Sequence, residues 1–572
     1  MNISVLFNTF IGGETSPLMA ARIDSQTYAM GARRMENMIP MMTGGVRKRP
    51  GTWYVGTTKN NANARLIEWL LSDGTCVILE ITAGTIRVWN EGNTMVQELS
   101  ADYSSGQIAG IKYAASANNL WLVHSQKRPC KITWNGASFS KTEPTFTGKN
   151  FAVSNNFPGS AAFSAGRLCF AGTASEPNRI YMSKAPNSLT GEDRYTDFTA
   201  GDNPADAIVL EENDMQGSRL QWIFSNRSLL AATERATWSD TGEVPTPATF
   251  DMRIVEYSGA NSLQAHGTKE IIVYAGRNGK TLRALVWTQS SESIGFIDMD
   301  ISQYAAHLFT AGIRDIAVAD YPYPIIWIVT NDGTLISCTI NISMGVIAYA
   351  RHPTDGIVEA AAVAHQTKGD VLYLVVGRGT ERNIEYLILE DLVNEDPAES
   401  HYVDAGERRQ YQTPVKTLIG LNRFAGKKIQ IFADGSPEVP VEVNDQGVAH
   451  LQASAAKIHL GLPYKTILSP NTPQLPANGT SFGKKRRVEQ VKLQLYKSIG
   501  GKAGVTEDKA EKIITQRFGS YVLGSAAEPY TGEVDITVSG NIDPECKLII
   551  VHEEPAPFTI LALVERIAIL EA

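Results

Sequence analysis

The stretch at residues 325–335 reads IIWIVTNDGTL. It joins an apolar run, Ile325 to Thr330, to an Asp332-Gly333 pair. β-Branched and aromatic residues are enriched in strands, and Asp or Asn followed by Gly accepts the positive φ of a tight hairpin turn. The stretch therefore predicts a strand, a tight turn and the start of a second strand that runs back beside the first.

The same pattern recurs from about residue 63 to residue 392. Short apolar runs of this kind are Cys76–Ile81, Thr85–Trp89, Leu120–His124, Arg167–Phe170, Glu270–Ala275 and Val371–Val376. Further hairpin signals are Asp73-Gly74, Ala83-Gly84, Asn135-Gly136 and Asn278-Gly279. Consecutive hairpins predict antiparallel meanders and a mainly β chain.

Such a long series of hairpins must bury the faces of its sheets and protect their edges. A β-propeller does so by radial repetition of small sheets. The sequence contains no exact repeat and no usual blade signature, so we expect a divergent, propeller-like domain over residues 59–404. A pair of two-sheet sandwiches is the alternative.

The two ends of the chain differ from this middle part. Residues 1–58 hold a candidate helix, Tyr28 to Met38, in an otherwise extended path, and have too little apolar surface to fold alone. We expect this segment to pack on another part of the chain or on a neighbouring subunit. Residues 405–572 are expected to form a β-rich platform domain together with it, with a long polar connection near 465–485.

The composition of the chain argues against some classes of function. The 572 residues are 43% hydrophobic and 20% charged, and 52 basic against 60 acidic side chains give a net charge of −8. An acidic protein is unsuited to neutralising nucleic-acid phosphates along its surface. No apolar run approaches the roughly 20 residues of a membrane-spanning helix, and no secretory signal is evident at the N-terminus, so we expect a soluble protein without a membrane span.

Motifs of catalysis and metal binding are not evident. Gly279-Lys280-Thr281 lacks the first glycine of a phosphate-binding loop and is expected to be a hairpin turn. Asp298-Met299-Asp300 lacks the glycine and the glutamate of a calcium loop. The nine histidines are scattered, and the five cysteines are widely spaced and expected to be small core residues. We therefore expect no enzyme, no metal site and no cofactor.

The strongest basic cluster is Lys484, Lys485, Arg486 and Arg487. Its simplest interpretation is a solvated turn before a strand over Val488–Tyr496. A contact to an acidic partner or to phosphate is the other interpretation.

The N-terminal segment contains an ordered series of motif residues. They are Gly12, Gly13, Ser16, Pro17, Arg22, Asp24, Asn37, Gly45, Arg49, Pro50 and Gly51. The series closely resembles the opening of the tail nozzle, or tail tubular protein B, family of short-tailed phages. A second block resembles the distal propeller strands of the same family, in the segments 306–309, 327–335, 348–352, 354–356 and 371–376. Tyr349 departs from the pattern, because the family often has Trp there.

The resemblance implies a structural protein of the virion tail, made in the host bacterial cytoplasm. It implies a homo-hexameric nozzle below the portal and the adaptor, with fibres or spikes on its side and double-stranded DNA passing through its middle without sequence recognition. Because residues 44–52 combine three cations with a Gly pair and Pro50, we expect them to form a strap on an acidic neighbour. Arg49→Glu is then expected to impair docking without unfolding the monomer. A local turn with solvated charges is the alternative.

The alternative from another class is a propeller-type tail protein that binds host glycan. Tryptophan rings can stack on sugars, but most of the nine tryptophans lie in or beside apolar strand runs, which is typical of core residues.

Overall fold

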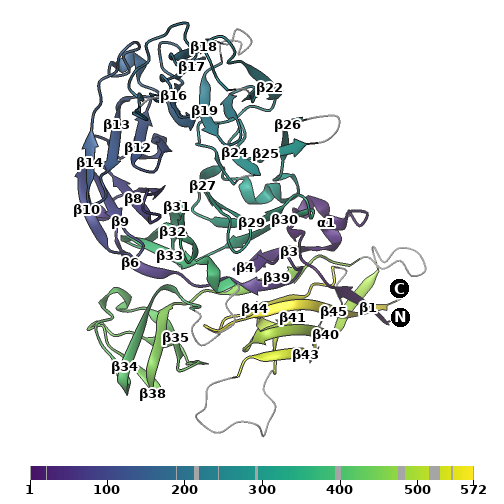
Figure 1. The fold of residues 1–572 in the computed structure, drawn as a ribbon. Helices are drawn as coiled ribbons and strands as arrows, with labels where there is room; N and C mark the ends of the chain where they lie inside the picture. Colours follow the sequence, from purple (N-terminus) through teal and green to yellow (C-terminus); the bar gives the residue numbers. More distant parts are fainter. Residues whose placement is uncertain are drawn as a thin grey trace.

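The structure is a computed structural model. It describes residues 2–20, 22–187, 190–211, 218–242, 244–268, 270–289, 294–392, 401–473, 484–514, 528–540, 542 and 545–570. Strands dominate these residues, and a ring of small sheets stands on a second β region that contains both chain ends (Figure 1).

Five consecutive sheets have four antiparallel strands each, paired in chain order. Blade 1 has β7 (Arg65–Leu70), β8 (Cys76–Thr82), β9 (Thr85–Trp89) and β10 (Met95–Ser100). Blade 2 has β11 (Lys112–Ala115), β12 (Asn119–His124), β13 (Lys127–Trp134) and β14 (Phe139–Thr142). Blade 3 has β15 (Ser160–Ser164), β16 (Arg167–Ala171), β17 (Arg179–Met182) and β18 (Ile208–Glu211). Blade 4 has β19 (Leu220–Ser225), β20 (Leu229–Thr233), β21 (Thr237–Asp240) and β22 (Met252–Glu256). Blade 5 has β23 (His266–Gly267), β24 (Ile271–Ala275), β25 (Leu282–Gln289) and β26 (Ile294–Asp300).

Two further blades complete the ring. Blade 6 has β27 (Ile313–Ala319), β28 (Ile325–Thr330), β29 (Leu335–Asn341) and β30 (Val346–His352). Blade 7 has β31 (Ile357–Gln366), β32 (Gly369–Arg378) and β33 (Glu381–Ile388), and its fourth strand is β6 (Trp53–Thr57) from the N-terminal segment. β31 also contacts β7 of blade 1, so the ring closes. The described residues therefore form a seven-bladed propeller, which confirms the predicted propeller fold rather than the pair of sandwiches.

Each blade packs on both of its neighbours, which explains the apolar runs. In β28, Trp327 packs toward blade 7, whereas Ile326 and Ile328 pack toward blade 5. Because both faces of the sheet are buried, the strand is apolar throughout instead of alternating. The five expected hairpin turns within the propeller each join paired strands, and their glycines have φ between +66° and +91°.

The second β region, the platform, combines the two ends of the chain. From the N-terminal side come β1 (Asn2–Phe7), β2 (Gly13–Glu14), β3 (Gly31–Glu36), β4 (Met38–Pro40) and β5 (Val46–Lys48). From the C-terminal side come β39 (Thr466–Pro470), β40 (Lys485–Ser498), β41 (Lys502–Gly504), β42 (Glu511–Lys512), β43 (Tyr530–Thr537), β44 (Ile549–His552) and β45 (Thr559–Leu570). Phe10, Met35 and Val46 share one core with Leu468 and Leu563, which confirms a platform built by both ends.

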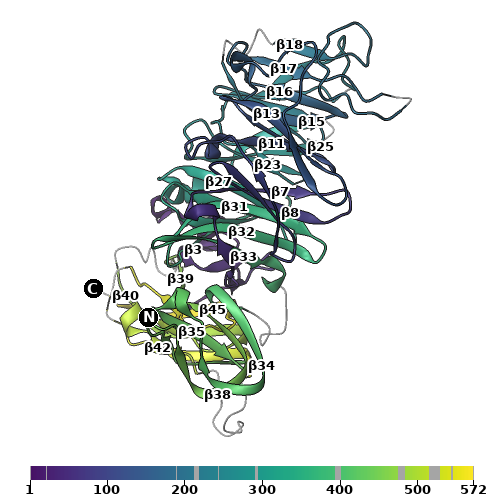
Figure 2. The same ribbon diagram turned by 90° about the vertical axis from the view of Figure 1, so that its left-hand side faces the viewer.

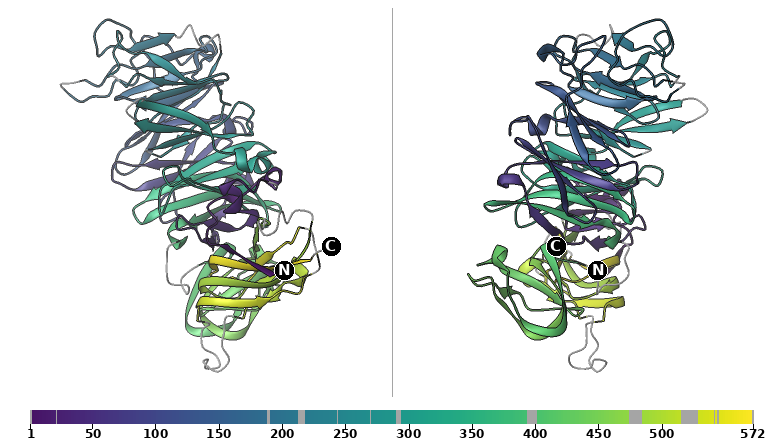
Figure 3. Two further views of the ribbon diagram at one scale, coloured as in Figure 1. Left: turned by 90° about the vertical axis from the view of Figure 1, so that its right-hand side faces the viewer. Right: turned by 60° about the vertical axis from the view of Figure 1, so that its left-hand side comes forward.

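A smaller lobe lies beside the platform (Figures 1 and 2). Its strands are β34 (Asp404–Leu418), β35 (Lys428–Ala433), β36 (Ser436–Pro437), β37 (Val441–Glu442) and β38 (Ala449–Leu462). Two sheets run on from the propeller: β30 of blade 6 bonds to β3 of the platform, and β6 of blade 7 bonds to β34 of the lobe. The views in Figure 3 show the ring standing on these two β units.

The described helices are short. They are α1 (Gln26–Ala29) and the 3-10 turns η1 (Pro17–Met19), η2 (Lys59–Asn61), η3 (Ile108–Gly110), η4 (Ser154–Asn156), η6 (Gln303–Phe309), η7 (Leu389–Leu392), η8 (Asn422–Phe424) and η9 (Glu507–Lys509). Among the residues that the structure describes, no helix has the length and apolar character needed to cross a membrane.

Two expectations are corrected here. The predicted helix over Tyr28–Met38 is wrong, because α1 ends at Ala29 and the following residues pair as β3 with β39. Burial of that segment in the platform core outweighs its local helix propensity. The predicted connection over 465–485 begins with a strand, β39, and its residues 474–483 lie outside the described residues.

Candidate functional site at the junction of propeller and platform

The strap, residues 44–52, crosses from the platform to the propeller. Its strand β5 pairs with β4 and β45 in the platform, and β6 follows directly in blade 7 (Figure 1). Motif residues of the N-terminal segment gather around this crossing, so we treat the junction as the candidate site.

Arg49 is the centre of the junction. Its Nη1 and Nη2 donate to the two carboxylate oxygens of Asp404 at 2.8 and 2.7 Å, and its Nε donates to Asn37 Oδ1 at 2.7 Å. The guanidinium lies 4.0 Å from the ring centroid of Tyr464. The side chains of Arg49 and Asp404 are 3% and 0% exposed. Burial alone raises the pKa of Asp404, but the charge and hydrogen bonds of Arg49 outweigh it and hold that pKa at about 2.

The structure corrects the expectation for Arg49→Glu. The acidic neighbour of the strap is Asp404 of the same chain, and the pair is buried. Glutamate at position 49 would place two carboxylates together in the interior, which costs folding free energy. The monomer is therefore expected to lose stability, and the variant is unsuited to testing assembly.

A second buried ion pair stands next to the first. Arg378 Nε and Nη2 bond to the carboxylate of Glu385 at 2.5 and 2.8 Å. Thr354 connects the pairs, since it donates to Asp404 at 2.6 Å and accepts from Arg378 at 3.1 Å. Thr52 of the strap donates to Glu385 at 2.5 Å. The network thus ties blade 7, the strap and the lobe together.

Lys48 is buried on the platform side of the strap. Its Nζ donates to the carbonyl of Glu554 at 2.6 Å and lies 3.2 Å from Nδ1 of His552. His552 uses Nε2 to donate to the carbonyl of Ile499, so Nδ1 is the acceptor for Lys48. Burial lowers the pKa of Lys48 to about 7 and that of His552 well below its usual value.

The first motif residues position Glu14, which the motif series omits. Gly13 has φ +60°, and a Cβ there would meet Tyr349 N at 2.2 Å, so only glycine fits. Glu14 follows, fully buried: it accepts the backbone N–H of Met35 at 2.8 Å, forms an ion pair with Arg351 and contacts His307 at 3.0 Å. These contacts join the N-terminal segment to blade 6. In the sequence, Glu14 stands alone among apolar and small residues, and this isolation was the signal that could have identified it.

Other motif residues of this group shape the backbone. A Cβ at Gly12 would meet Thr27 O at 2.3 Å. Ser16 caps η1, because its Oγ accepts from Leu18 N at 3.3 Å, and Pro17 occupies the first position of that turn.

The later motif residues pack within the junction itself. Asn37 has φ +52° and donates to the carbonyls of Pro353 and Lys465 at 2.9 and 2.7 Å. Gly45 packs against the backbone of β45, Pro50 is buried, and a Cβ at Gly51 would meet Val403 O at 2.0 Å. These residues hold the crossing chain close to its neighbours.

Arg22 and Asp24 do not join the junction. They form a surface ion pair of 2.8 Å, and their side chains are 59% and 65% exposed. Leu18 and Ile23 beside them are exposed as well, at 93% and 58%. Exposed apolar residues grouped with charges are typical of an interaction surface. We call Pro17, Leu18 and Ala20 with Arg22–Asp24 the exposed loop.

The basic cluster forms the start of a strand. β40 begins at Lys485, so the expected solvated turn before Val488 is wrong for three of the four residues. Lys484 is half-buried, Lys485 and Arg487 are exposed, and Arg486 is buried and donates to the carbonyl of Pro473 at 3.1 Å. The four cations therefore do not share one surface.

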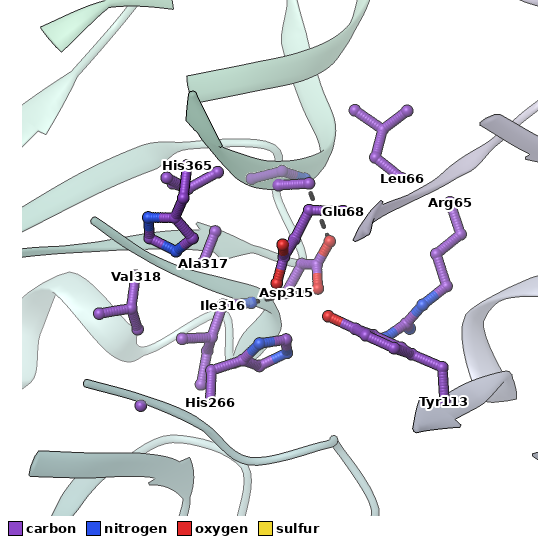
Figure 4. A pocket seen from close by; sticks show the side chains of 14 residues that line it. Arg65, Leu66, Glu68, Tyr113, His266, Asp315, Ile316, Ala317, Val318 and His365 are labelled. Carbon is purple, nitrogen blue, oxygen red and sulfur yellow. Dashed lines mark hydrogen bonds between the residues drawn. The ribbon is translucent and has the colours of Figure 1, made fainter. Parts of the chain in front are cut away.

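The axis of the propeller holds a small polar cavity of about 50 Å³ (Figure 4). Glu68 of β7 and Asp315 of β27 face each other there, with Arg65 and Tyr113 on one side and His266 below. Burial raises the pKa of both carboxyl groups. It lowers the pKa of His266 to about 3.

The axis of the propeller is closed next to this cavity by a side chain. The side chain of Gln264, which precedes blade 5, bridges to β11 of blade 2 on the opposite side of the axis. Its amide donates to the carbonyl of Tyr113 and accepts the N–H of Tyr113, both at 3.1 Å. A polymer such as DNA therefore has no passage through the propeller of one chain.

The motifs rejected in the sequence have structural roles. Gly279 lies in the turn between β24 and β25, which confirms the predicted hairpin. Asp298 accepts hydrogen bonds from Arg283, Tyr274 and Ser258. Within the described ranges, no group of three or more His, Cys, Asp or Glu side chains is placed to hold a metal ion.

The cysteines and tryptophans are interior residues. All five cysteines are buried, as predicted. Trp69, Trp121, Trp222, Trp238 and Trp327 are buried. Trp53, Trp89, Trp134 and Trp287 are half-buried. All nine tryptophans fall among the described residues, and none is fully exposed, so the prediction that most are core residues is confirmed.

Comparisons with known proteins assign no family and no function to the chain. No family model and no curated protein matches the chain. The solved structure of U3-55K is 11% identical, covers 58% of this chain and 100% of its own, and has a TM-score of 0.38. Virginiamycin B lyase from Staphylococcus aureus is 12% identical, with coverages of 58% and 97% and a TM-score of 0.37. The β-propeller domain of Cps50 (Swd1) from Myceliophteria thermophila is 9% identical, with coverages of 59% and 99% and a TM-score of 0.39.

By its sheet topology, the chain belongs to the class of β-propeller proteins. The seven blades carry a second β region, the platform with its lobe, which both chain ends complete.

Proposed function

We propose that this protein is a non-enzymatic subunit of a hexameric tail nozzle of a short-tailed phage. The observation that carries the proposal is the position of the N-terminal motif series. Most of its residues lie at the junction of propeller and platform, and Arg22 and Asp24 remain exposed beside Leu18 and Ile23. A segment that both fixes two domains and presents a surface is suited to ring assembly.

The junction supports a rigid subunit. The buried Arg49–Asp404 pair and two continuous sheets connect the propeller to the platform and its lobe, so the propeller is held at a fixed angle to the part that would form the ring. Ring closure requires the same angle in every copy, because a variable angle gives open assemblies. This rigidity favours a structural role.

The path of DNA would lie between the subunits. Each propeller axis is closed at Gln264, so the channel would be the space that six platforms surround. Six copies at −8 each give −48 in total. A wall with few cations lets a polyanion slide without binding it, which suits an exit channel. Adaptor and fibre proteins would contact the ring from outside this channel.

The exposed loop is the proposed contact between neighbouring subunits. Leu18→Asp is expected to weaken the ring and leave the fold intact, since Leu18 is 93% exposed. Val244→Asp is the matched control, because Val244 is 81% exposed on blade 4 and outside the platform.

The test is the mass and symmetry of the purified protein. Six chains of 62.3 kDa give about 374 kDa, and negative-stain images should show a six-fold ring. Leu18→Asp should shift the mass toward the monomer, and Val244→Asp should not. A protein that stays monomeric at high concentration and with the adaptor protein present would refute the proposal. The glycan-binding alternative loses its main support, because the tryptophans expected to stack on sugar are buried or half-buried.

A further inference from the structure

The propeller axis opens at its other end into a wide funnel of about 690 Å³. It lies across the Tyr113–Gln264 bridge from the cavity of Figure 4. Blades 2 to 6 and the turn η3, which precedes blade 2, supply its described wall. We call it the axial funnel. Its charged lining residues are Lys112, Arg219, Arg314 and Glu234.

Lys112 is the decisive residue of the axial funnel. It is 7% exposed, and its Nζ donates to the backbone carbonyl of Gln221. A neutral carbonyl does not balance the charge of a buried ammonium group, which is costly to hold in the interior. The carboxylate among the described lining residues, Glu234, accepts from the side chain of Gln221 at 3.2 Å. An anion in the funnel would supply the missing countercharge.

The charge of the axial funnel opposes that of the whole protein. Its described lining residues include three permanent or potential cations and one carboxylate, whereas the chain carries −8. A local reversal of sign in a concave site concentrates anions there. Arg219 and Arg314 are exposed at the rim, so an incoming ligand reaches them before it reaches Lys112.

The remaining lining residues indicate a hydroxyl-rich ligand. Ser125, Asn261, Ser262 and Asn331 offer hydroxyl and amide groups that donate and accept hydrogen bonds. Among the described lining residues, His124 is the one ring side chain, and none is a Trp, Tyr or Phe that could stack on a nucleobase. Binding of nucleic acid by stacking is therefore disfavoured relative to binding of a hydrophilic anion.

We propose that the axial funnel binds an anionic sugar, a saccharide that carries a carboxylate or a phosphate group, with Lys112 on the anionic group and Arg314 at the rim. This site does not depend on ring assembly, because a single chain supplies the whole lining. It also uses none of the tryptophans of the glycan alternative.

Binding of an anion next to Lys112 is expected to depend on pH. Burial, together with Arg219 and Arg65, lowers the pKa of Lys112 to about 7. Lysine loses its charge as pH rises through this value, so affinity for an anion is higher at pH 6 than at pH 8, by up to about tenfold. The other charged and titratable groups of the surrounding elements are Arg65, His124, Glu234 and Arg314. Burial, with a smaller contribution from Lys112 and Lys127, lowers the pKa of His124, which disfavours its protonated form.

The test is calorimetric titration of the full-length protein at pH 6 with D-glucuronate, D-glucose 6-phosphate, D-glucose, inorganic phosphate and oligothymidylate. Both anionic sugars should bind, with glucose and inorganic phosphate at least about tenfold weaker. Lys112→Met should reduce sugar affinity at least about tenfold, and Arg314→Gln should reduce it less. Lys428→Met, an exposed lysine of the lobe, is the matched control and should bind like the unchanged protein.

Several outcomes would overturn the proposal. They are absence of binding, equal binding of glucose, phosphate binding as tight as that of the sugars, and oligothymidylate binding with the same dependence on Lys112. Arg314→Gln guards against misfolding of Lys112→Met, because Arg314 is exposed and its replacement leaves the interior unchanged. Unchanged sugar affinity in both variants would place the ligand elsewhere and also refute the proposal.

Discussion

Neutralising Asp404 should loosen the strap. In Asp404→Asn the side chain keeps its shape, but the buried guanidinium of Arg49 loses its countercharge. Removing one member of a buried, hydrogen-bonded ion pair costs about 3–5 kcal/mol. The depressed pKa of Asp404, about 2 against an ordinary 3.8, corresponds to about 2–3 kcal/mol of net stabilisation of the ionised carboxylate after the cost of burial. The two figures agree in order of magnitude.

Hydrogen–deuterium exchange of the strap measures this cost directly. The N–H of Arg49 bonds to Asn37 O at 2.9 Å and the N–H of Gly51 to His401 O at 2.6 Å, so both exchange only when the strap opens. A loss of about 3–5 kcal/mol predicts exchange at least about 100-fold faster in Asp404→Asn. Asp24→Asn, which breaks the exposed pair with Arg22, is the control and should leave strap exchange unchanged.

A double variant and a pH series decide whether the charge is the cause. In the double variant, Arg49→Met with Asp404→Asn, the strap should exchange more slowly than the summed effects of the two single variants predict. The reason is that no uncompensated charge remains. Since the folded pKa of Asp404 is depressed, its contribution is present above about pH 4 and disappears as pH falls toward 2. Strap exchange that is the same in the unchanged protein and Asp404→Asn, or strictly additive losses in the double variant, would refute the reasoning.

Three further predictions concern other buried groups. Glu14→Gln should lower the free energy of unfolding by about 3 kcal/mol, because Arg351 loses its buried partner; an unchanged denaturation midpoint would contradict this. The cysteines should not react with Ellman's reagent at pH 8 until the protein is unfolded, because they are buried and burial raises the pKa of four of them to between about 11 and 12 (Cys76, Cys130, Cys169 and Cys338). One thiol that reacts in the native protein would show this to be wrong. Glu565→Gln should raise the melting temperature at pH 8 and not at pH 4. Burial raises the folded pKa of Glu565 to about 8, so its ionisation opposes folding increasingly from about pH 4.5 to pH 8. A melting difference that does not vary with pH would contradict that cause.

The propeller was accessible to sequence reasoning because its signals are local. Tight turns depend on two residues, as at Asp332-Gly333, and blades buried on both faces give continuous apolar runs such as Ile325–Thr330. Neither signal depends on which blade lies next to which. Blade number was not accessible, because the blades have diverged and no period is visible.

The junction was less accessible because its contacts join distant residues. Arg49 and Asp404 are 355 positions apart, and three cations in nine strap residues have the composition of a solvated segment. The role of β6 was missed for the same reason, since its partner β33 lies more than 300 residues away. Helix propensity over Tyr28–Met38 was misleading, because tertiary burial of Ala32 and Met35 decided the structure there.

The position of β6 couples the two halves of the molecule. On one side it completes blade 7 through β33, and on the other it bonds to β34 of the lobe. The strap that precedes it is paired with β45, close to the C-terminus. Pulling the strap out of its place would therefore open the ring of blades and uncover the platform core at the same time. A subunit with this arrangement cannot change the angle between propeller and platform by a hinge at the strap without losing the Arg49–Asp404 pair, so we expect its two halves to move as one body in any assembly.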